Sequence, residues 1–154
     1  MISITAKWPP LMNHKGFNLL ELLVTVTIIG ILAMIAYPSY VGHTTKTRRA
    51  EAMSLLLQDA GFMERYYTEN GCYRTKTGTT YSNPTLPYSR SPATGSTVFY
   101  TIQLDTATSS KCSTFTLTAD PTGSPQASDG TLTLDDTGKR CWSKNTNCNP
   151  VGWQ

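Results

Sequence analysis

The chain has 154 residues, enough for one small domain and too few for two, because domains typically run to roughly 100 to 150 residues. Lys and Arg together number 13 against 10 acidic residues, so the chain is only mildly basic. No long run of either charge occurs, and the composition therefore excludes the strongly basic class of nucleic-acid-binding proteins.

The longest apolar segment covers residues 17–40 and contains one charged side chain, Glu21. A helix of this length spans the roughly 30 Å hydrocarbon core of a bilayer. His14 and Lys15 lie just before the segment, and positively charged flanks stay in the cytoplasm. We therefore expect the segment to cross a membrane once, with the C-terminal part outside the cytoplasm.

A helical pattern continues beyond residue 40, because apolar side chains recur three or four positions apart. Asn70 and Gly71 supply a stop signal, so the pattern predicts one helix over residues 17–70, about 80 Å long at 1.5 Å per residue. The apolar stripe is Met53, Leu56, Leu57, Ala60, Met63 and Tyr67, and the polar positions outside it include Lys46, Arg48, Glu51, Gln58 and Asp59.

The C-terminal half has the pattern of a small antiparallel sheet. Residues 72–97 are rich in Thr, Ser, Tyr, Gly and Pro and predict a long loop. Period-two alternation then predicts strands at residues 98–105, around 115–119 and around 132–134. Three or four strands, with the amphipathic half of the helix on one face, give an α+β fold.

Glu21 is the residue of the apolar segment that needs an explanation. A carboxylate in lipid costs several kcal/mol and is a functional candidate by default. Residues 17–40 contain no Lys, Arg or His, but cleavage before Phe17 would create an amine, in the same chain or in a neighbouring subunit. An ordinary signal peptide explains the segment less well, since the run is too long and Ala33 and Ala36 do not form a cleavage site.

The motif Lys15-Gly16-Phe17-Asn18-Leu19-Leu20-Glu21-Leu22, followed by the apolar run, resembles the cleavage and methylation motif of type IV prepilins. Later stretches are similar to minor pilins of the PilE-like kind. They are Gly30, Ala36-Tyr37-Pro38, residues 64–71, Ser91-Pro92-Ala93-Thr94-Gly95, Phe115-Thr116-Leu117-Thr118-Ala119 and Gly130-Thr131-Leu132-Thr133-Leu134.

The resemblance implies that a prepilin peptidase removes a leader, residues 1–16, by cutting after Gly16, and methylates the amine of Phe17. It leaves a transmembrane and assembly helix, residues 17–40, which would cross the bacterial inner membrane once, and a periplasmic α+β domain, residues 41–154. Removing Lys7 and Lys15 would leave 11 basic against 10 acidic residues.

The resemblance also assigns roles inside the apolar segment. Glu21 would attract the amine of an adjacent subunit, and the helix would bend or melt at Gly30 and Pro38. Asn18 stands where relatives usually have Thr or Ser, and Met12 is an alternative start to Met1.

The four cysteines all follow the apolar segment, which favours two disulfides in an oxidising compartment over a metal site. Three pairings are possible. We favour Cys141 with Cys148, which leaves Cys72 to tie the long loop to Cys112. Relatives often place a cysteine where this chain has Asp129, so the pairing cannot be transferred from them.

The main functional prediction is a minor pilin, a structural subunit that assembles with other major and minor pilins through the inner-membrane pilus machinery. Its pilus would reach the cell exterior and support adhesion, twitching motility or DNA uptake. The alternatives are a major pilin, a type II secretion pseudopilin, and a pilin that binds DNA or surfaces.

DNA binding has one candidate patch in the sequence, Lys139, Arg140 and Lys144 around Trp142, which Asp135 and Asp136 weaken. For catalysis, His43 is the one histidine after the proposed cut and no nucleophile motif occurs, so we expect neither an enzyme nor a cofactor.

Overall fold

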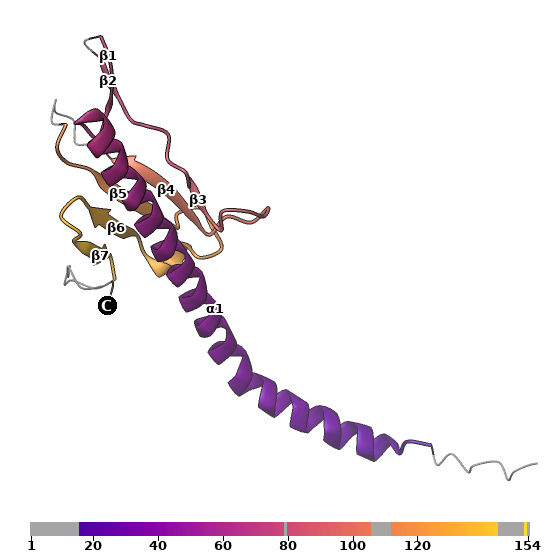
Figure 1. Cartoon of the computed structure of the whole chain (residues 1–154). Helices are drawn as coiled ribbons and strands as arrows, with labels where there is room; N and C mark the ends of the chain where they lie inside the picture. The colour runs from indigo at the N-terminus through magenta and orange to yellow at the C-terminus, as the bar shows by residue number, and fades with distance from the viewer. Residues whose placement is uncertain (1–15, 79, 106–111, 145–152, 154) are drawn as a thin grey trace, which may run out of the picture. The chain divides into compact units, whose positions relative to one another are not determined.

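The computed structural model describes residues 16–78, 80–105, 112–144 and 153 (Figure 1). It confirms the α+β fold, with one long helix followed by antiparallel strands in the described part of the chain. The elements are α1 (Leu19–Asn70), β1 (Thr75–Thr77), β2 (Thr80–Ser82), β3 (Arg90–Ser91), β4 (Tyr100–Asp105), β5 (Thr116–Asp120), the 3-10 helix η1 (Ala127–Asp129), β6 (Leu132–Asp135) and β7 (Arg140–Trp142).

The structure divides into two compact units between Tyr40 and Val41, and α1 contributes to both. In the first unit every described side chain is exposed, although most are large and apolar. The most apolar 18-residue window of α1 has a mean hydropathy of 2.5, and none of it is buried inside the protein. Among the described residues α1 is thus the one helix long and apolar enough to cross a membrane.

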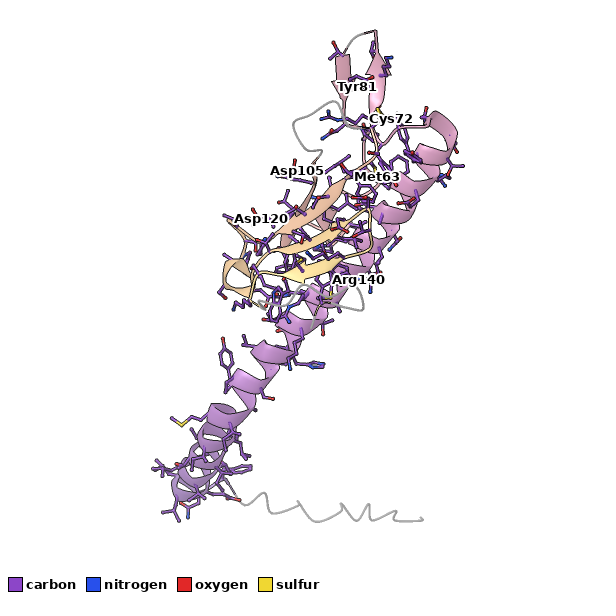
Figure 2. All side chains as sticks on the ribbon, turned by 90° about the vertical axis from the view of Figure 1, so that its left-hand side faces the viewer. Met63, Cys72, Tyr81, Asp105, Asp120 and Arg140 are labelled. Atoms are coloured by element: carbon purple, nitrogen blue, oxygen red, sulfur yellow. A yellow bond between two sulfur atoms is a disulfide. The ribbon has the colours of Figure 1, made fainter. Side chains whose placement is uncertain are left out.

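In the second unit, one face of α1 is buried against the sheet. Figure 2 shows Met63 on this face, among the side chains of the core. The predicted stripe is correct at Leu56 and Met63, but Tyr67 is exposed and Asp59, expected on the polar side, is fully buried. Helical spacing finds the buried face but does not fix its width, so a polar residue at its border was misplaced.

The main sheet has five antiparallel strands in the order β3-β4-β5-β6-β7, one more than the upper limit of our prediction. The predicted alternation is confirmed in the central strands, where Tyr100, Ile102, Leu117, Leu132 and Leu134 point into the core. The edge strands β3 and β7 have two and three residues, too few to show a period-two pattern.

The prediction of a loop over residues 72–97 was wrong in part. Strands β1 and β2 form a separate antiparallel hairpin within it, which projects beyond the main sheet in both views (Figures 1 and 2), and β3 pairs with β4. These strands are polar and mostly exposed, so no hydrophobic pattern marks them in the sequence.

Candidate functional site

The N-terminal end of α1 is capped by Asn18. Its side-chain Oδ1 accepts a hydrogen bond from the backbone N–H of Leu20 at 3.3 Å, and its carbonyl accepts the N–H groups of Glu21 and Leu22 at 3.0 and 3.2 Å. Asn, Ser and Thr all serve as N-caps because a short polar side chain can satisfy the free amides of the first turn. Asn18 therefore does the capping work that Thr or Ser would do at this position.

Glu21 lies in the first turn of α1, where the positive end of the helix dipole favours an anion. The one salt bridge between described residues joins Arg49 to Asp129, so Glu21 has no cationic partner in the described part of its own chain. Phe17, at 76 % exposure, precedes it on the surface. The structure thus places an unpaired carboxylate in an otherwise apolar, exposed helical segment.

Two threonine hydroxyls of this segment are satisfied within the helix. Thr25 Oγ1 donates to the carbonyl of Leu22 at 2.9 Å, and Thr27 Oγ1 donates to that of Leu23 at 2.7 Å. Hydroxyls bonded in this way cost little in lipid, because every backbone and side-chain polar group there must find an internal partner.

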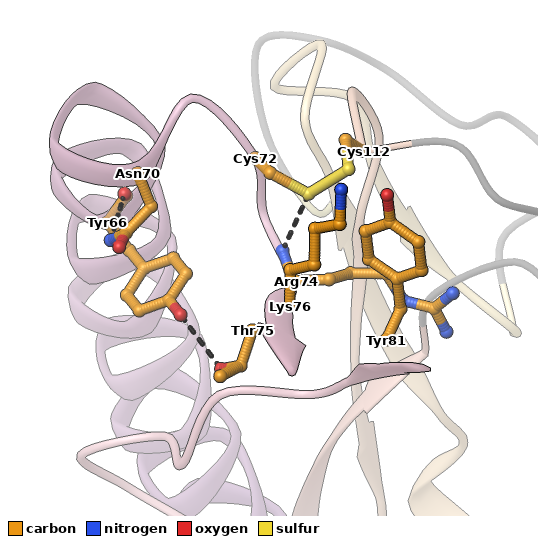
Figure 3. Close-up of a pocket in the computed structure, with 8 residues that line it drawn as sticks. All are labelled: Tyr66, Asn70, Cys72, Arg74, Thr75, Lys76, Tyr81 and Cys112. Carbon is orange, nitrogen blue, oxygen red and sulfur yellow. Dashed lines mark hydrogen bonds between the residues drawn. A yellow bond between two sulfur atoms is a disulfide. The ribbon is translucent and has the colours of Figure 1, made fainter. Parts of the chain in front are cut away.

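A pocket of about 370 Å³ lies in the second unit, between the end of α1 and the β1–β2 hairpin (Figure 3). The Cys72–Cys112 disulfide forms part of its wall, and the Tyr66 hydroxyl bridges the helix to Thr75 Oγ1 at 2.8 Å. The lining residues are Tyr66, Asn70, Cys72, Arg74, Thr75, Lys76, Tyr81 and Cys112.

The chemistry of this pocket suits an anion that carries an aromatic group. Lys76 and Tyr81 are direct cross-strand partners, and the Lys76 ammonium lies 5.8 Å from the centroid of the Tyr81 ring. Figure 3 shows the two side chains next to each other beside the disulfide, across the pocket from Tyr66. The residues that line the pocket include two cations and no acid. Sequence reasoning missed this site because Lys76 and Tyr81 lie in the segment we predicted as a loop.

The basic patch that we considered from the sequence is arranged differently. Arg49 stacks over the Trp142 ring at 3.8 Å, and the indole N–H of Trp142 donates to the carbonyl of Asp129 at 2.7 Å. Arg140 lies over Trp153 at 5.3 Å. Trp142 therefore has structural partners on one ring face and at its N–H, and it is a poor platform for a nucleic-acid base.

Arg49 and Asp129 form a salt bridge that joins α1 to the end of η1. Arg49 Nε and Nη2 donate to the two carboxylate oxygens at 2.7 and 2.5 Å, and Tyr100 and Gln126 also donate to Oδ2. Burial alone would raise the pKa of Asp129, but the hydrogen bonds from Arg49, Tyr100 and Gln126 outweigh it and hold the pKa below its usual value.

The disulfide between Cys72 and Cys112 is the pairing that we favoured, and it closes a sequence separation of 40 residues. The other predicted pair involves Cys148, which lies outside the described residues, so that bridge stays a prediction. Within the described part of the chain no group of three or more His, Cys, Asp and Glu residues could hold a metal.

Two family models match the chain. The prokaryotic N-terminal methylation motif matches residues 11–37, which contain Gly16, Phe17 and Glu21. A family described as type IV minor pilin ComP, DNA uptake sequence receptor, matches residues 38–135. The chain belongs to this family of type IV minor pilins.

Individual relatives match part of this pilin. It is 39 % identical to fimbrial protein EcpC of Eikenella corrodens over 60 residues, which are 39 % of each chain. It is 36 % identical to the major pilin PilE of Neisseria gonorrhoeae over 60 residues, 39 % of this chain and 36 % of that one. Type II secretion system core protein G of Klebsiella pneumoniae is 33 % identical over 63 residues, 41 % and 45 % of the two chains. The match spans less than half the length of each relative.

Two solved pilin structures are also similar. The non-core minor pilin PilV of Neisseria meningitidis is 25 % identical, with 73 % of this chain and 98 % of that chain covered and a TM-score of 0.46. A type IV pilin from Shewanella oneidensis is 31 % identical, with 68 % and 97 % covered and a TM-score of 0.41.

Proposed function

We propose that this pilin is cut after Gly16, methylated at Phe17 and drawn into a pilus by Glu21. The observation that carries the proposal is the unpaired Glu21 carboxylate, four residues from the amine that cleavage would create. The amine of a neighbouring subunit would neutralise Glu21 only when the two helices are in register. Pairing would then make correct alignment the state of lowest electrostatic cost.

Before assembly, residues 17–40 would cross the inner membrane once, with residues 41–154 in the periplasm. The exposed apolar surface of the first unit supports this proposal, because a surface of that kind needs lipid or other apolar helices around it. Its partners would be the prepilin peptidase, the inner-membrane assembly machinery and other pilins. The family is one of structural pilins, and we propose no catalytic role for the chain.

Gly30 and Pro38 would give this helix local freedom during the transfer from lipid to filament. Pro38 lies inside α1 and cannot donate a backbone hydrogen bond to the preceding turn, which weakens the helix there. Apart from the helix's own nearby backbone, no atom lies within 4 Å of the position that a Cβ at Gly30 would take, and a glycine inside a helix weakens it relative to alanine.

Replacing Glu21 by Ala tests the assembly role. We expect the Glu21→Ala pilin to be cleaved normally but to fall at least tenfold in sheared pili, measured by immunoblot against the amount in membranes. Glu51→Ala, a change at an exposed acidic residue on the same helix, is the matched control and should enter pili at the wild-type level. Normal incorporation of Glu21→Ala would contradict the proposed role.

A second candidate function is DNA binding by the displayed domain. It is favoured by the description of the matching family as a DNA uptake sequence receptor, and by the pocket that holds Arg74, Lys76 and Tyr81. Lysine and arginine neutralise phosphates, and a tyrosine ring offers a stacking face to a base. An exposed hairpin also lets a long, stiff duplex reach these side chains without entering the core.

The DNA function is tested with the detergent-solubilised full chain and a short double-stranded oligonucleotide. We expect the affinity to fall steeply with salt, and Lys76→Ala to lower the slope of log K against log salt by about 1. Lys139→Ala, at an exposed lysine next to β7, is the control and should leave the slope unchanged. Absence of salt-dependent retention would exclude this function, and an effect of Lys139→Ala alone would exclude the pocket.

A further inference from the structure

Asp59 is a fully buried carboxylate on the face of α1 that packs into the core. Its Oδ1 accepts one hydrogen bond, from the backbone N–H of Tyr88 at 3.1 Å, and its Oδ2 has no hydrogen-bond partner among the described residues. The cost of burying a polar oxygen without a partner is of order 1 to 3 kcal/mol, and larger when the group is charged. Asp59 is therefore placed where its ionised form is poorly tolerated.

The partner of Asp59 belongs to an irregular segment, residues 83–89, which we call the strap. Its ends are tied to β4, because Asn83 Nδ2 donates to the carbonyl of Leu104 at 2.9 Å and the N–H of Ile102 donates to the carbonyl of Ser89 at 2.8 Å. The middle of the strap is joined to α1 by the hydrogen bond to Asp59. Pro84 and Pro87 have no N–H, so few backbone donors are left to hold it.

Asp129 shows how this protein stabilises a buried carboxylate as an anion. Arg49, Tyr100 and Gln126 all donate hydrogen bonds to Asp129, and the pKa of Asp129 is lowered. No positive charge contributes at Asp59, where burial raises the pKa to about 6 and the N–H of Tyr88 opposes the rise only in part. Ionisation therefore stabilises the buried position of Asp129 and destabilises that of Asp59.

Asp59 is the residue whose titration we expect to control this contact, as the groups around it show. On α1 the residues one turn away are Leu55, Leu56, Phe62 and Met63, which carry no charge. The strap contributes the phenol of Tyr88, whose N–H is the donor to Asp59. On the sheet side, the hydroxyl of Tyr100 donates to Asp129, and Arg49 is paired with the same carboxylate.

We propose that Asp59 is a pH-sensitive latch, which holds the strap closed on α1 while it is protonated and releases it more readily once it is ionised. Opening lets water reach the carboxylate and so relieves the cost of the buried charge.

The direction of the effect follows from the linkage between proton binding and opening. In the closed form the pKa of Asp59 is about 6, and in the open form it returns toward 3.8, so the closed form binds more protons between these values. Closure is therefore most stable below about pH 3.8 and weakens as pH rises to about 6. The weakening is complete just below neutral pH.

The latch is tested by amide hydrogen exchange at Tyr88 in the detergent-solubilised full chain, corrected for the intrinsic pH dependence of exchange. We expect the opening equilibrium at Tyr88 to rise about 50-fold between pH 4 and pH 7, as the two pKa values require. Asp59→Asn should remove this dependence, because an amide does not titrate. Asp105→Asn, at an exposed position at the end of β4, is the control and should retain it.

Two results would overturn the latch: protection of Tyr88 that does not change with pH in the wild type, or an equal change in Asp59→Asn. The first of these results is measured on the wild type, so the test does not depend on whether Asp59→Asn folds. The carboxyl carbon of Asp59 should titrate in NMR spectra with a midpoint near 6. A midpoint at or below the ordinary aspartate value would contradict the proposal.

Discussion

Asp129 and Arg49 provide a non-covalent link between α1 and the 3-10 helix η1. The Arg49 side chain is 17 % exposed and that of Asp129 is 3 % exposed, so water screens the pair only weakly. Oδ2 of the carboxylate also accepts hydrogen bonds from Tyr100 and Gln126, in addition to the one from Arg49. This arrangement meets the conditions under which a buried ion pair is tolerated.

Breaking this pair on one side should be costly. We expect Asp129→Ala to lower the free energy of unfolding by about 3 kcal/mol, because it leaves the Arg49 guanidinium partly buried without its anion. The measurement is urea unfolding of the full chain in detergent, with Asp105→Ala as a surface control within about 0.5 kcal/mol of wild type.

A double replacement separates the charge from the packing. Arg49→Met with Asp129→Leu should lose less stability than Asp129→Ala alone, because neither charge is left unpaired. If the stability lost by the double variant instead equals the sum of the losses of the two single variants, this account of the pair is contradicted.

The sequence was informative about residues whose chemistry is unusual for their surroundings. Glu21 was identifiable because it is the one charge in residues 17–40, and the pairing of Cys72 with Cys112 was a choice among three. The burial of Asp59 and Asp129 could not be predicted, because an aspartate on a helix or in a turn is expected to be exposed until its tertiary partners are known. Lys76 and Tyr81 could be recognised as neighbours only through the register of the hairpin.

Among the secondary-structure elements, the helix was predicted well. The predicted end at residue 70 matches α1, and the start differs by two residues because Asn18 is the cap and so lies just outside. Long periodic segments repeat the same signal many times, which makes a helix of this length conspicuous.

The short strands were predicted less well. β4, β5 and β6 alternate buried and half-buried or exposed side chains, and each was found. β1, β2, β3 and β7 have three residues or fewer, and their pairing is set by the strand beside them. A strand of that kind forms because it pairs with its neighbour, so its own sequence contains little signal that predicts it.

At the scale of the whole molecule, one helix serves two environments. Its residues up to Tyr40 expose apolar side chains throughout, and its residues from Val41 onward bury one face against a sheet. The first part suits lipid and the packing of other apolar helices, and the second belongs to the α+β unit that carries the sheet. The two family models divide the chain close to the same place, because the methylation motif matches residues 11–37 and the minor pilin family matches residues 38–135.

The cut between Gly16 and Phe17 is the central step of the proposed assembly, because cleavage would create the cation that Glu21 needs. The direct test is the intact mass, with N-terminal sequencing by mass spectrometry, of the pilin purified from pili of its own host. We expect a chain that begins at N-methylated Phe17, and a Gly16→Ala variant that stays in the membrane with its leader attached. A purified pilin that begins elsewhere, or that has no methyl group on its first residue, would contradict the account.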